Sequence, residues 1–226
     1  MSPVKVFGSA AFTNVARVLV CLEELGVEYE IVDVDFHAKE HKGPDHLARN
    51  PFGQVPAFQD GDLVLFESRA ICRYVFRKYM ATADGTSNLL RNGGDDLAES
   101  AALVDAWLDV EALQYEPAVH AVFVQHRVVP ALGGTPDETV IAASVEKLRQ
   151  VLEVYEARLA EYRYLAGGDR VSLADLNHFP YTYYFMTMPY ASVFDSFPRV
   201  KAWWEELVAR PAVQKVARMM ADHSAG

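Results

Sequence analysis

Residues 50–71 read NPFGQVPAFQDGDLVLFESRAI, and this stretch combines turn, strand and helix signals in a short space. Residues 50–53 have turn chemistry, and residues 60–62 (DGD) predict a hairpin between two strands. The first of these strands begins at residues 54–58, where a proline requires an edge position or a special backbone. The second covers residues 63–66, and Ser68 is predicted to begin a helix that reaches about Tyr79.

Toward the N-terminus, two alternating β-rich stretches, residues 4–7 and 29–36, enclose a helical pattern. That helix starts near residue 14, with Thr13 or Asn14 as its cap, and ends at Gly26. A β-α-β order favours parallel pairing of the two strands. Residues 37–50 are polar and predict a loop with a short helical piece, so residues 1–80 form a domain of order β-α-β-α-β-β-α.

Beyond residue 80 the character of the chain changes. Residues 81–96 are small, polar and glycine-rich, which predicts a linker. Residues 97–226 contain no convincing strand and predict an all-helical domain. Helices are expected over residues 97–126, 138–163, 197–207 and 212–220, with a break at 130–136, and another helix starts from a capping box at Ser172 and Asp175.

Composition excludes several classes of function. The 226 residues carry a formal net charge of −10, which disfavours nucleic acid or an anionic membrane as a partner. The seven histidines are scattered and the two cysteines lack ligand spacing, so no metal site is expected. Neither a signal peptide nor an apolar run of about eighteen residues is visible, and a reducing cytosolic location fits best.

Several motifs together resemble the glutathione transferase family, and the resemblance covers nearly the whole chain. Residues 50–71 are similar to its glutathione-binding half, and residues 172–181 (SLADLNHFPY) to the capping box and staple of its helical half. Residues 38–57 and 197–216 resemble the plant phi class, most closely its grass sequences. The resemblance implies a thioredoxin-like α/β domain (1–80), a linker (81–96) and an all-α domain (97–226) that forms the hydrophobic-substrate pocket.

The resemblance also implies residues for each part of glutathione, which carries two carboxylates, an amine and a thiol. A cis bond before Pro56 would turn the main chain of Val55 outward to pair with the cysteinyl unit, although an ordinary turn proline is the alternative. Ser68 would bind the γ-glutamyl carboxylate at a helix start, and Glu67 would face the amine; Ser68 as a simple helix cap is compatible with this.

At the other end of glutathione, His41 and Lys42 are implied to contact the glycine carboxylate, and Gln54 the peptide group. Taken alone, an adjacent histidine and lysine are usually solvated surface.

The group that activates the thiol is the point where this chain departs from the class. A free cysteine thiol has a pKa of about 8.5, so a hydroxyl donor and a helix N-terminus are needed to favour the thiolate. Phe12 stands where the phi class has a serine. Thr13 is therefore predicted to contribute its hydroxyl or its N–H; the alternatives are weaker catalysis by the helix end alone, or a protein that only binds, with Phe12 as a wall of its pocket.

The second substrate implied by the family is an apolar electrophile or a hydroperoxide bound between the two halves. The residues implied for it are Phe12, Phe36, Tyr115, His120 and Phe123. Core packing is the alternative for these aromatic side chains, most of all for Tyr115. Cysteine-based redox catalysis is not expected, because Cys21 lies two turns inside the first helix rather than at its start.

We therefore predict a glutathione transferase that conjugates reduced glutathione, as co-substrate, to hydrophobic electrophiles, with possible peroxidase activity on organic hydroperoxides. A non-catalytic ligand carrier of the same fold is the main alternative, and a structural assembly module is a third. The family resemblance implies a twofold homodimer, with Phe52 and the helix face over residues 69–73 as candidate contacts.

Overall fold

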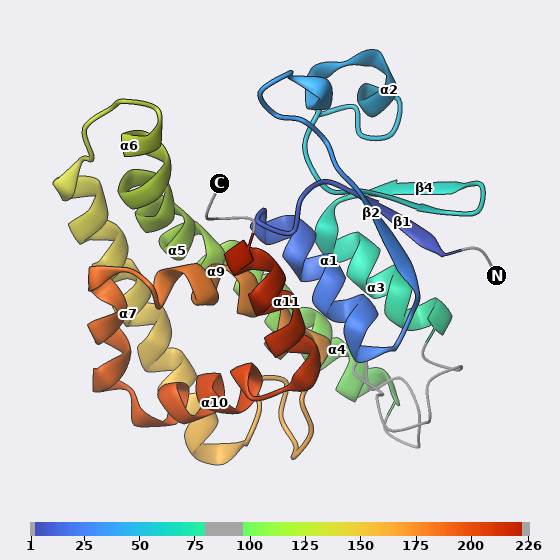
Figure 1. Cartoon of the computed structure of the whole chain (residues 1–226). Coiled ribbons are helices and arrows are strands. Elements are labelled where there is room, and N and C mark those ends of the chain that lie inside the picture. The colour runs from blue at the N-terminus through green and yellow to red at the C-terminus, as the bar shows by residue number, and fades with distance from the viewer. Residues whose placement is uncertain (1–2, 80–96, 223–226) are drawn as a thin grey trace. The chain divides into compact units, whose positions relative to one another are not determined.

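The computed structural model describes residues 3–79 and 97–222, and it divides the chain into two compact units. The first unit combines Met1–Leu90 with Arg210–Gly226, and the second comprises Arg91–Ala209. The predicted linker, residues 81–96, lies outside the described residues. Figure 1 shows the elements of each unit, and the two units are described separately below.

The first unit is built on a four-stranded sheet of order β2-β1-β3-β4. Strand β1 (Val4–Phe7) pairs in parallel with β2 (Tyr29–Val32) and antiparallel with β3 (Ala57–Asp60). Strand β4 (Leu63–Phe66) pairs antiparallel with β3. The parallel β-α-β unit and the hairpin predicted from the sequence are both confirmed.

Two strands are shorter than the alternating pattern predicts. Strand β2 ends at Val32 rather than at residue 36, because its neighbour β1 ends at Phe7 and residues beyond Val32 have no strand beside them. Strand β3 begins after Pro56, which lacks the N–H needed for the ladder. The loop before β3 is therefore longer than expected, and it carries several of the predicted site residues.

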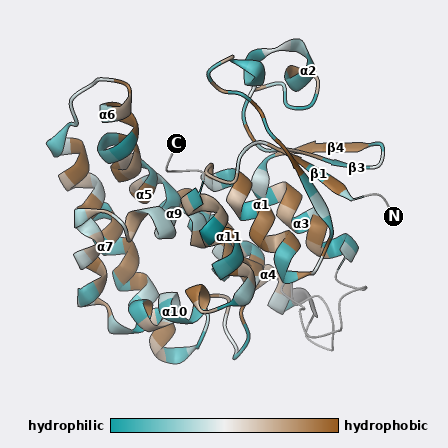
Figure 2. Ribbon diagram, in the orientation of Figure 1, coloured by the Kyte–Doolittle hydropathy of each residue, from teal (hydrophilic) through white to brown (hydrophobic). Residues whose placement is uncertain are grey.

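Helices cover the sheet on both faces. Helix α1 (Thr13–Glu24) packs against α3 (Ser68–Tyr79), and both bury apolar side chains. The hydrophobic positions of the two helices are brown in Figure 2. The short helix η1 (Glu40–Lys42) and helix α2 (Pro44–Leu47) lie on the other side of the strands (Figure 1). The bounds of α3 and the short helical piece in residues 37–50 agree with the prediction.

The last helix, α11 (Pro211–Asp222), belongs to the first unit, although the sequence analysis assigned it to the helical domain over 97–226. It packs along α1. The guanidinium of Arg210 donates two hydrogen bonds of 2.6 Å to the carboxylate of Glu24, and Lys215 Nζ lies 2.7 Å from Glu23. Neither ion pair has a local sequence signal, because the partners are almost two hundred positions apart.

The second unit is helical throughout its described residues. Its elements are α4 (Leu97–Val110), η2 (Glu111–Tyr115), α5 (Glu116–Phe123), η3 (Val124–Val128), α6 (Val129–Ala131), α7 (Glu138–Glu161), α8 (Leu173–Asn177), α9 (Phe179–Phe185), η4 (Pro189–Ser196) and α10 (Pro198–Val208). The helix predicted over 97–126 contains two π-helical segments, η2 and η3, and continues to Ala131. Pro130 lies in the first turn of the separate short helix α6, where a proline is tolerated, so the predicted break begins only after Ala131.

The predicted capping box at Ser172 is confirmed, and its carboxylate does more than cap a helix. Asp175 is fully buried and accepts hydrogen bonds from the N–H and the hydroxyl of Ser172, at 2.8 and 2.6 Å. It also accepts from Leu165 N–H and from Trp203 Nε1, both at 3.0 Å. One side chain therefore joins the loop after α7, the start of α8, and α10.

Within residues 3–79 and 97–222, no helix has the length and apolarity required to cross a bilayer. In the same ranges, no three histidine, cysteine or acidic side chains converge as ligands for a metal ion.

Replacing Asp175 by alanine should lower the free energy of unfolding of the second unit by at least about 3 kcal/mol, because several buried donors lose their acceptor. Urea unfolding followed by circular dichroism measures this. Asp169 is exposed in the same segment, so Asp169→Ala is a matched control and should change stability by less than about 0.5 kcal/mol. An Asp175→Ala variant as stable as this control would contradict the anchoring role.

Candidate functional site

The predicted glutathione-binding residues all belong to the first unit and come from three connections around the sheet. These are the loop between β1 and α1, the long segment between β2 and β3, and the junction of β4 with α3. Each connection contributes a distinct chemical feature.

The first connection leaves the start of α1 without a side-chain cap. The N-cap position is Phe12, which has extended backbone angles and no side-chain group that can accept a hydrogen bond. The first amide bonded within the helix is that of Ala16, to the carbonyl of Phe12 at 2.9 Å. Among the described residues, the N–H groups of Thr13, Asn14 and Val15 have no acceptor, so this helix end can receive an anion.

The prediction that Thr13 or Asn14 caps α1 is wrong, because the helix begins one position earlier than expected and Asn14 is engaged elsewhere. Its side-chain oxygen accepts a short hydrogen bond from the guanidinium of Arg17. The same guanidinium donates to the hydroxyl of Ser68 at 3.0 Å, and that hydroxyl lies 3.4 Å from the Asn14 oxygen. These three side chains link the start of α1 to the start of α3.

Arg17 is fully buried, and the sequence analysis did not single it out. A signal for it exists: Arg17 lies near the N-terminal end of α1, where a positive charge opposes the helix dipole, and its neighbours in the sequence are apolar. A buried guanidinium in such a position requires hydrogen-bond acceptors that offset its loss of hydration. The cation also places positive charge beside the Ser68 hydroxyl, which favours a carboxylate at this point.

At the junction of β4 with α3, Glu67 adopts a left-handed conformation with φ of 67°. Its side chain is exposed, while its carbonyl accepts the Ile71 amide at 2.9 Å and so begins α3. A non-glycine residue in this region is strained by about 1–3 kcal/mol and such residues cluster at functional sites. The strain directs the Glu67 side chain outward while Ser68 stays buried.

Lys42 stabilises the turn before β3 by hydrogen bonds to its main chain. Its ammonium donates to the carbonyls of Phe52 and Gly53, each at 3.0 Å. Gly53 has φ of 59°, and a Cβ there would lie 2.7 Å from the carbonyl oxygen of His41 and 2.9 Å from Lys42 Nζ, so no other residue fits. Since an ammonium has three donors, one remains for an external anion.

The next carbonyl, that of Gln54, accepts two hydrogen bonds. His46 Nε2 and Asn50 Nδ2 both lie 2.8 Å from it. The bond between Val55 and Pro56 is cis, as the family resemblance implied. Among the described residues, neither the N–H nor the carbonyl of Val55 has a hydrogen-bond partner, so this edge is open to the main chain of a ligand.

Phe12, Phe36 and His41 form a continuous stack of rings. The centroids of Phe12 and Phe36 are 4.4 Å apart, and those of Phe36 and His41 are 4.1 Å apart and nearly parallel. The Nδ1 atom of His41 is buried without a partner, and loss of hydration, followed by the charge of Lys42, lowers the pKa of His41. His41, predicted for glutathione, is therefore in contact with Phe36, predicted for the hydrophobic substrate.

The second unit contains the other residues predicted for the hydrophobic substrate. His120 is exposed, with Nδ1 3.0 Å from the Tyr181 hydroxyl, and the ring of Phe123 packs edge-on against Tyr181. Tyr115 is fully buried and its hydroxyl lies 2.6 Å from that of Thr182; burial raises the pKa of Tyr115. This environment favours core packing for Tyr115, the alternative left open by the sequence.

Both cysteines are fully buried, Cys21 in α1 and Cys72 in α3. Burial, together with the nearby Cys72 thiol, raises the pKa of Cys21. A thiol in such surroundings is a poor nucleophile. Neither cysteine is therefore placed to act as a nucleophile.

Comparison with known proteins identifies both halves of the chain. The model of the glutathione S-transferase N-terminal domain matches residues 2–77, and that of the C-terminal domain matches residues 112–211. The chain is 59% identical over 226 residues to the probable glutathione S-transferase GSTF1 of Oryza sativa subsp. japonica, with all of both chains covered. Such similarity confirms the fold class predicted from the sequence, a thioredoxin-like α/β part with an all-α part.

Solved structures agree. Glutathione S-transferase I from maize, in complex with an atrazine glutathione conjugate, has 52% sequence identity and a TM-score of 0.90, covering 97% of this chain and 99% of its own. A structure of glutathione S-transferase I bound with lactoylglutathione has a TM-score of 0.89 and the same identity, covering 96% of this chain and 100% of its own.

The strained backbone of Glu67 leads to a comparison of two variants. Glu67→Gly should be more stable than Glu67→Ala by about 1 kcal/mol, because alanine keeps the left-handed penalty while glycine avoids most of it. Urea unfolding of both variants measures the difference. Equal stability, or a more stable alanine variant, would show that the left-handed backbone carries no strain.

Proposed function

Because the chain belongs to the glutathione S-transferase family, we propose that it conjugates reduced glutathione to hydrophobic electrophiles. The observation that carries this proposal is the uncapped start of α1, where three amides lack acceptors beside the stacked rings of Phe12 and Phe36. A thiolate bound at these amides would lie next to an apolar electrophile packed on these rings. The relatives whose structures hold glutathione conjugates support the same reaction.

The γ-glutamyl group is proposed to bind where α3 begins. The Ser68 hydroxyl and the positive end of α3 suit its carboxylate, and the buried cation of Arg17 strengthens this preference. The exposed carboxylate of Glu67 suits the ammonium group. The carboxylate of the γ-glutamyl group would therefore lie near the positive charge of Arg17, and its ammonium group near the negative charge of Glu67.

The cysteinyl and glycyl units are proposed to follow the segment before β3. The open N–H and carbonyl of Val55 can pair with the cysteinyl main chain as an added strand does. The side chain of Gln54 is exposed and can reach the peptide group. His41 and the remaining donor of Lys42 suit the glycine carboxylate.

The activating group for the thiol is proposed to be Thr13, through its hydroxyl or its N–H. The side chain of Phe12 cannot donate a hydrogen bond, whereas the Thr13 hydroxyl has no partner among the residues described. A donated hydrogen bond and the helix end would both stabilise the thiolate, whose proton is released to water. The thiolate then forms a C–S bond with the electrophile, either by addition or with departure of a leaving group.

For the electrophile, the residues proposed are Phe12, Phe36, His120 and Phe123. Tyr115 is omitted because it is fully buried. Organic hydroperoxides are proposed as further substrates. One glutathione takes an oxygen atom from the hydroperoxide and leaves an alcohol. A second glutathione then reacts with this oxidised glutathione, which gives glutathione disulfide and water.

A ligand carrier of the same fold is the second candidate, and the specific observation in its favour is Phe12. Its ring packs on Phe36 and extends the apolar wall at the place where the class has a hydroxyl. The carrier hypothesis requires binding without any gain of thiolate.

Cytosolic localisation and a twofold homodimer stay predictions. The feature that supports a dimer is Phe52, which is 65% exposed and packs edge-on against Phe66.

Titration of the bound glutathione thiol by ultraviolet absorbance should show a thiol pKa below the solution value. In Thr13→Ala it should return toward that value if the hydroxyl is the activating group, because only the helix end then remains. A depressed pKa in both proteins would assign activation to the helix end and the main chain. No depression in the unsubstituted protein would favour the carrier.

Ser68→Ala should raise the KM for glutathione by about tenfold or more, since a hydrogen bond to a charged group is worth about 1.5–3 kcal/mol. Steady-state kinetics with 1-chloro-2,4-dinitrobenzene measures this, and urea unfolding checks that the fold survives. Ser192 is exposed in η4, so Ser192→Ala is the matched control and should leave the KM unchanged. Unchanged kinetics in both Ser68→Ala and Glu67→Ala would refute the assignment of the γ-glutamyl site.

A further inference from the structure

We propose that His46 is a positioning residue for glutathione: it contacts no part of the ligand but fixes the main-chain edge at Val55 on which the cysteinyl unit binds. This inference rests on the proposed function and adds a residue outside the predicted glutathione contacts. The sequence showed His46 only as one of several polar residues in a loop.

The first observation is the hydrogen bond itself. His46 is 3% exposed, and its Nε2 lies 2.8 Å from the carbonyl oxygen of Gln54. A carbonyl can only accept, so Nε2 carries the proton and Nδ1 is the bare nitrogen in the neutral ring. Nδ1 is buried and has no partner among residues 3–79 and 97–222, so within these ranges the contact with Gln54 is the only hydrogen bond of the ring.

The second observation is the place of that bond in the chain. Gln54 directly precedes Val55, and the rotation of the peptide between them sets the direction of the Val55 N–H. Asn50 donates to the same Gln54 carbonyl at 2.8 Å, while Lys42 holds the two carbonyls before it. Three consecutive carbonyls are thus held by side-chain donors, and His46 and Asn50, each 3% exposed, are the buried ones among these side chains.

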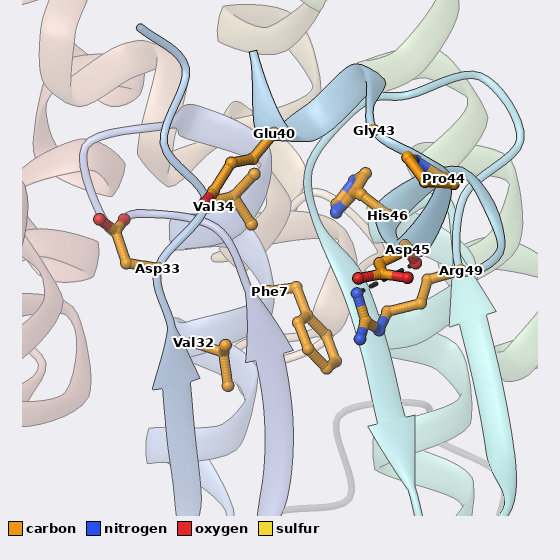
Figure 3. A pocket seen from close by; sticks show the side chains of 10 residues that line it. All are labelled: Phe7, Val32, Asp33, Val34, Glu40, Gly43, Pro44, Asp45, His46 and Arg49. Atoms are coloured by element: carbon orange, nitrogen blue, oxygen red, sulfur yellow. Dashed lines mark hydrogen bonds between the residues drawn. The ribbon is translucent and has the colours of Figure 1, made fainter. Parts of the chain in front are cut away.

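The third observation is a cavity of about 270 Å³ that His46 lines. In Figure 3 its ring lies between Val34 and Pro44, with Arg49 and Phe7 below it. The guanidinium of Arg49 lies 4.3 Å from the centre of the Phe7 ring and donates to the carbonyl of Asp45, so it is already engaged. The imidazole therefore separates this cavity from the Gln54 carbonyl, and removing the ring would join its space to the cavity.

These facts distinguish a positioning role from simple packing. If the N–H of the ring matters, a small molecule that enters the enlarged cavity and presents an N–H should restore glutathione binding. If only the volume matters, any ring of the same size should restore it. The cavity therefore makes chemical rescue possible at this residue.

The experiment measures the Kd of glutathione by calorimetry for His46→Ala, with and without imidazole, at a pH where imidazole is uncharged. We expect the Kd to rise about tenfold in the variant, as the loss of one net hydrogen bond implies. Imidazole should restore most of the affinity. 1-Methylimidazole has a similar shape but no N–H to donate, and it should not.

His37 is exposed in the same segment, so His37→Ala is the matched control and should bind glutathione normally, with no response to imidazole. His46→Gln keeps a donor that can approach Gln54 and should retain most of the affinity. It also provides the test, against His46→Leu, if the alanine variant does not fold.

Equal Kd values for His46→Ala and the unsubstituted protein would overturn the positioning role and leave the proposed function intact. Equal rescue by imidazole and 1-methylimidazole would also overturn it, because volume alone would then suffice. Failure of the unsubstituted protein to bind glutathione would overturn both proposals.

Discussion

The buried guanidinium of Arg17 is the interaction on which the arrangement of the site depends. It holds Asn14 at the start of one helix and Ser68 at the start of another, so the two positive helix ends keep a fixed separation. A charge inside the fold is stable only when its partners are in place. The position of a helix end is therefore linked to the formation of the whole α1–α3 layer, rather than to local propensity.

On the other side of the site, side-chain donors form hydrogen bonds with main-chain carbonyls. Lys42, His46 and Asn50 together hold the main chain that precedes Pro56. Main-chain recognition of a peptide requires a rigid edge, because each flexible bond would have to be ordered when the ligand binds. Lys42, which the family resemblance implies for ligand binding, therefore also stabilises the main chain of this turn.

Periodicity and turn chemistry predicted much of the fold. They located the hairpin at residues 60–62, the whole of α3, and the capping box at Ser172, since each of these signals is local. The same analysis missed Arg17 and His46, because burial of a polar residue depends on elements far away in the sequence. The family resemblance supplied the cis bond before Pro56, but it could not reveal which group replaces the serine at Phe12.

The helix α11 has a consequence for how the protein is made. Its residues are synthesised after the entire second unit, yet they pack on α1, and Arg210 pairs with Glu24. The unit that carries the glutathione residues therefore cannot complete its packing while the nascent chain is growing, although domains generally fold in the order of synthesis. The surface of α1 that α11 covers in the folded protein is exposed during this interval. The unit whose synthesis begins first therefore completes its packing last.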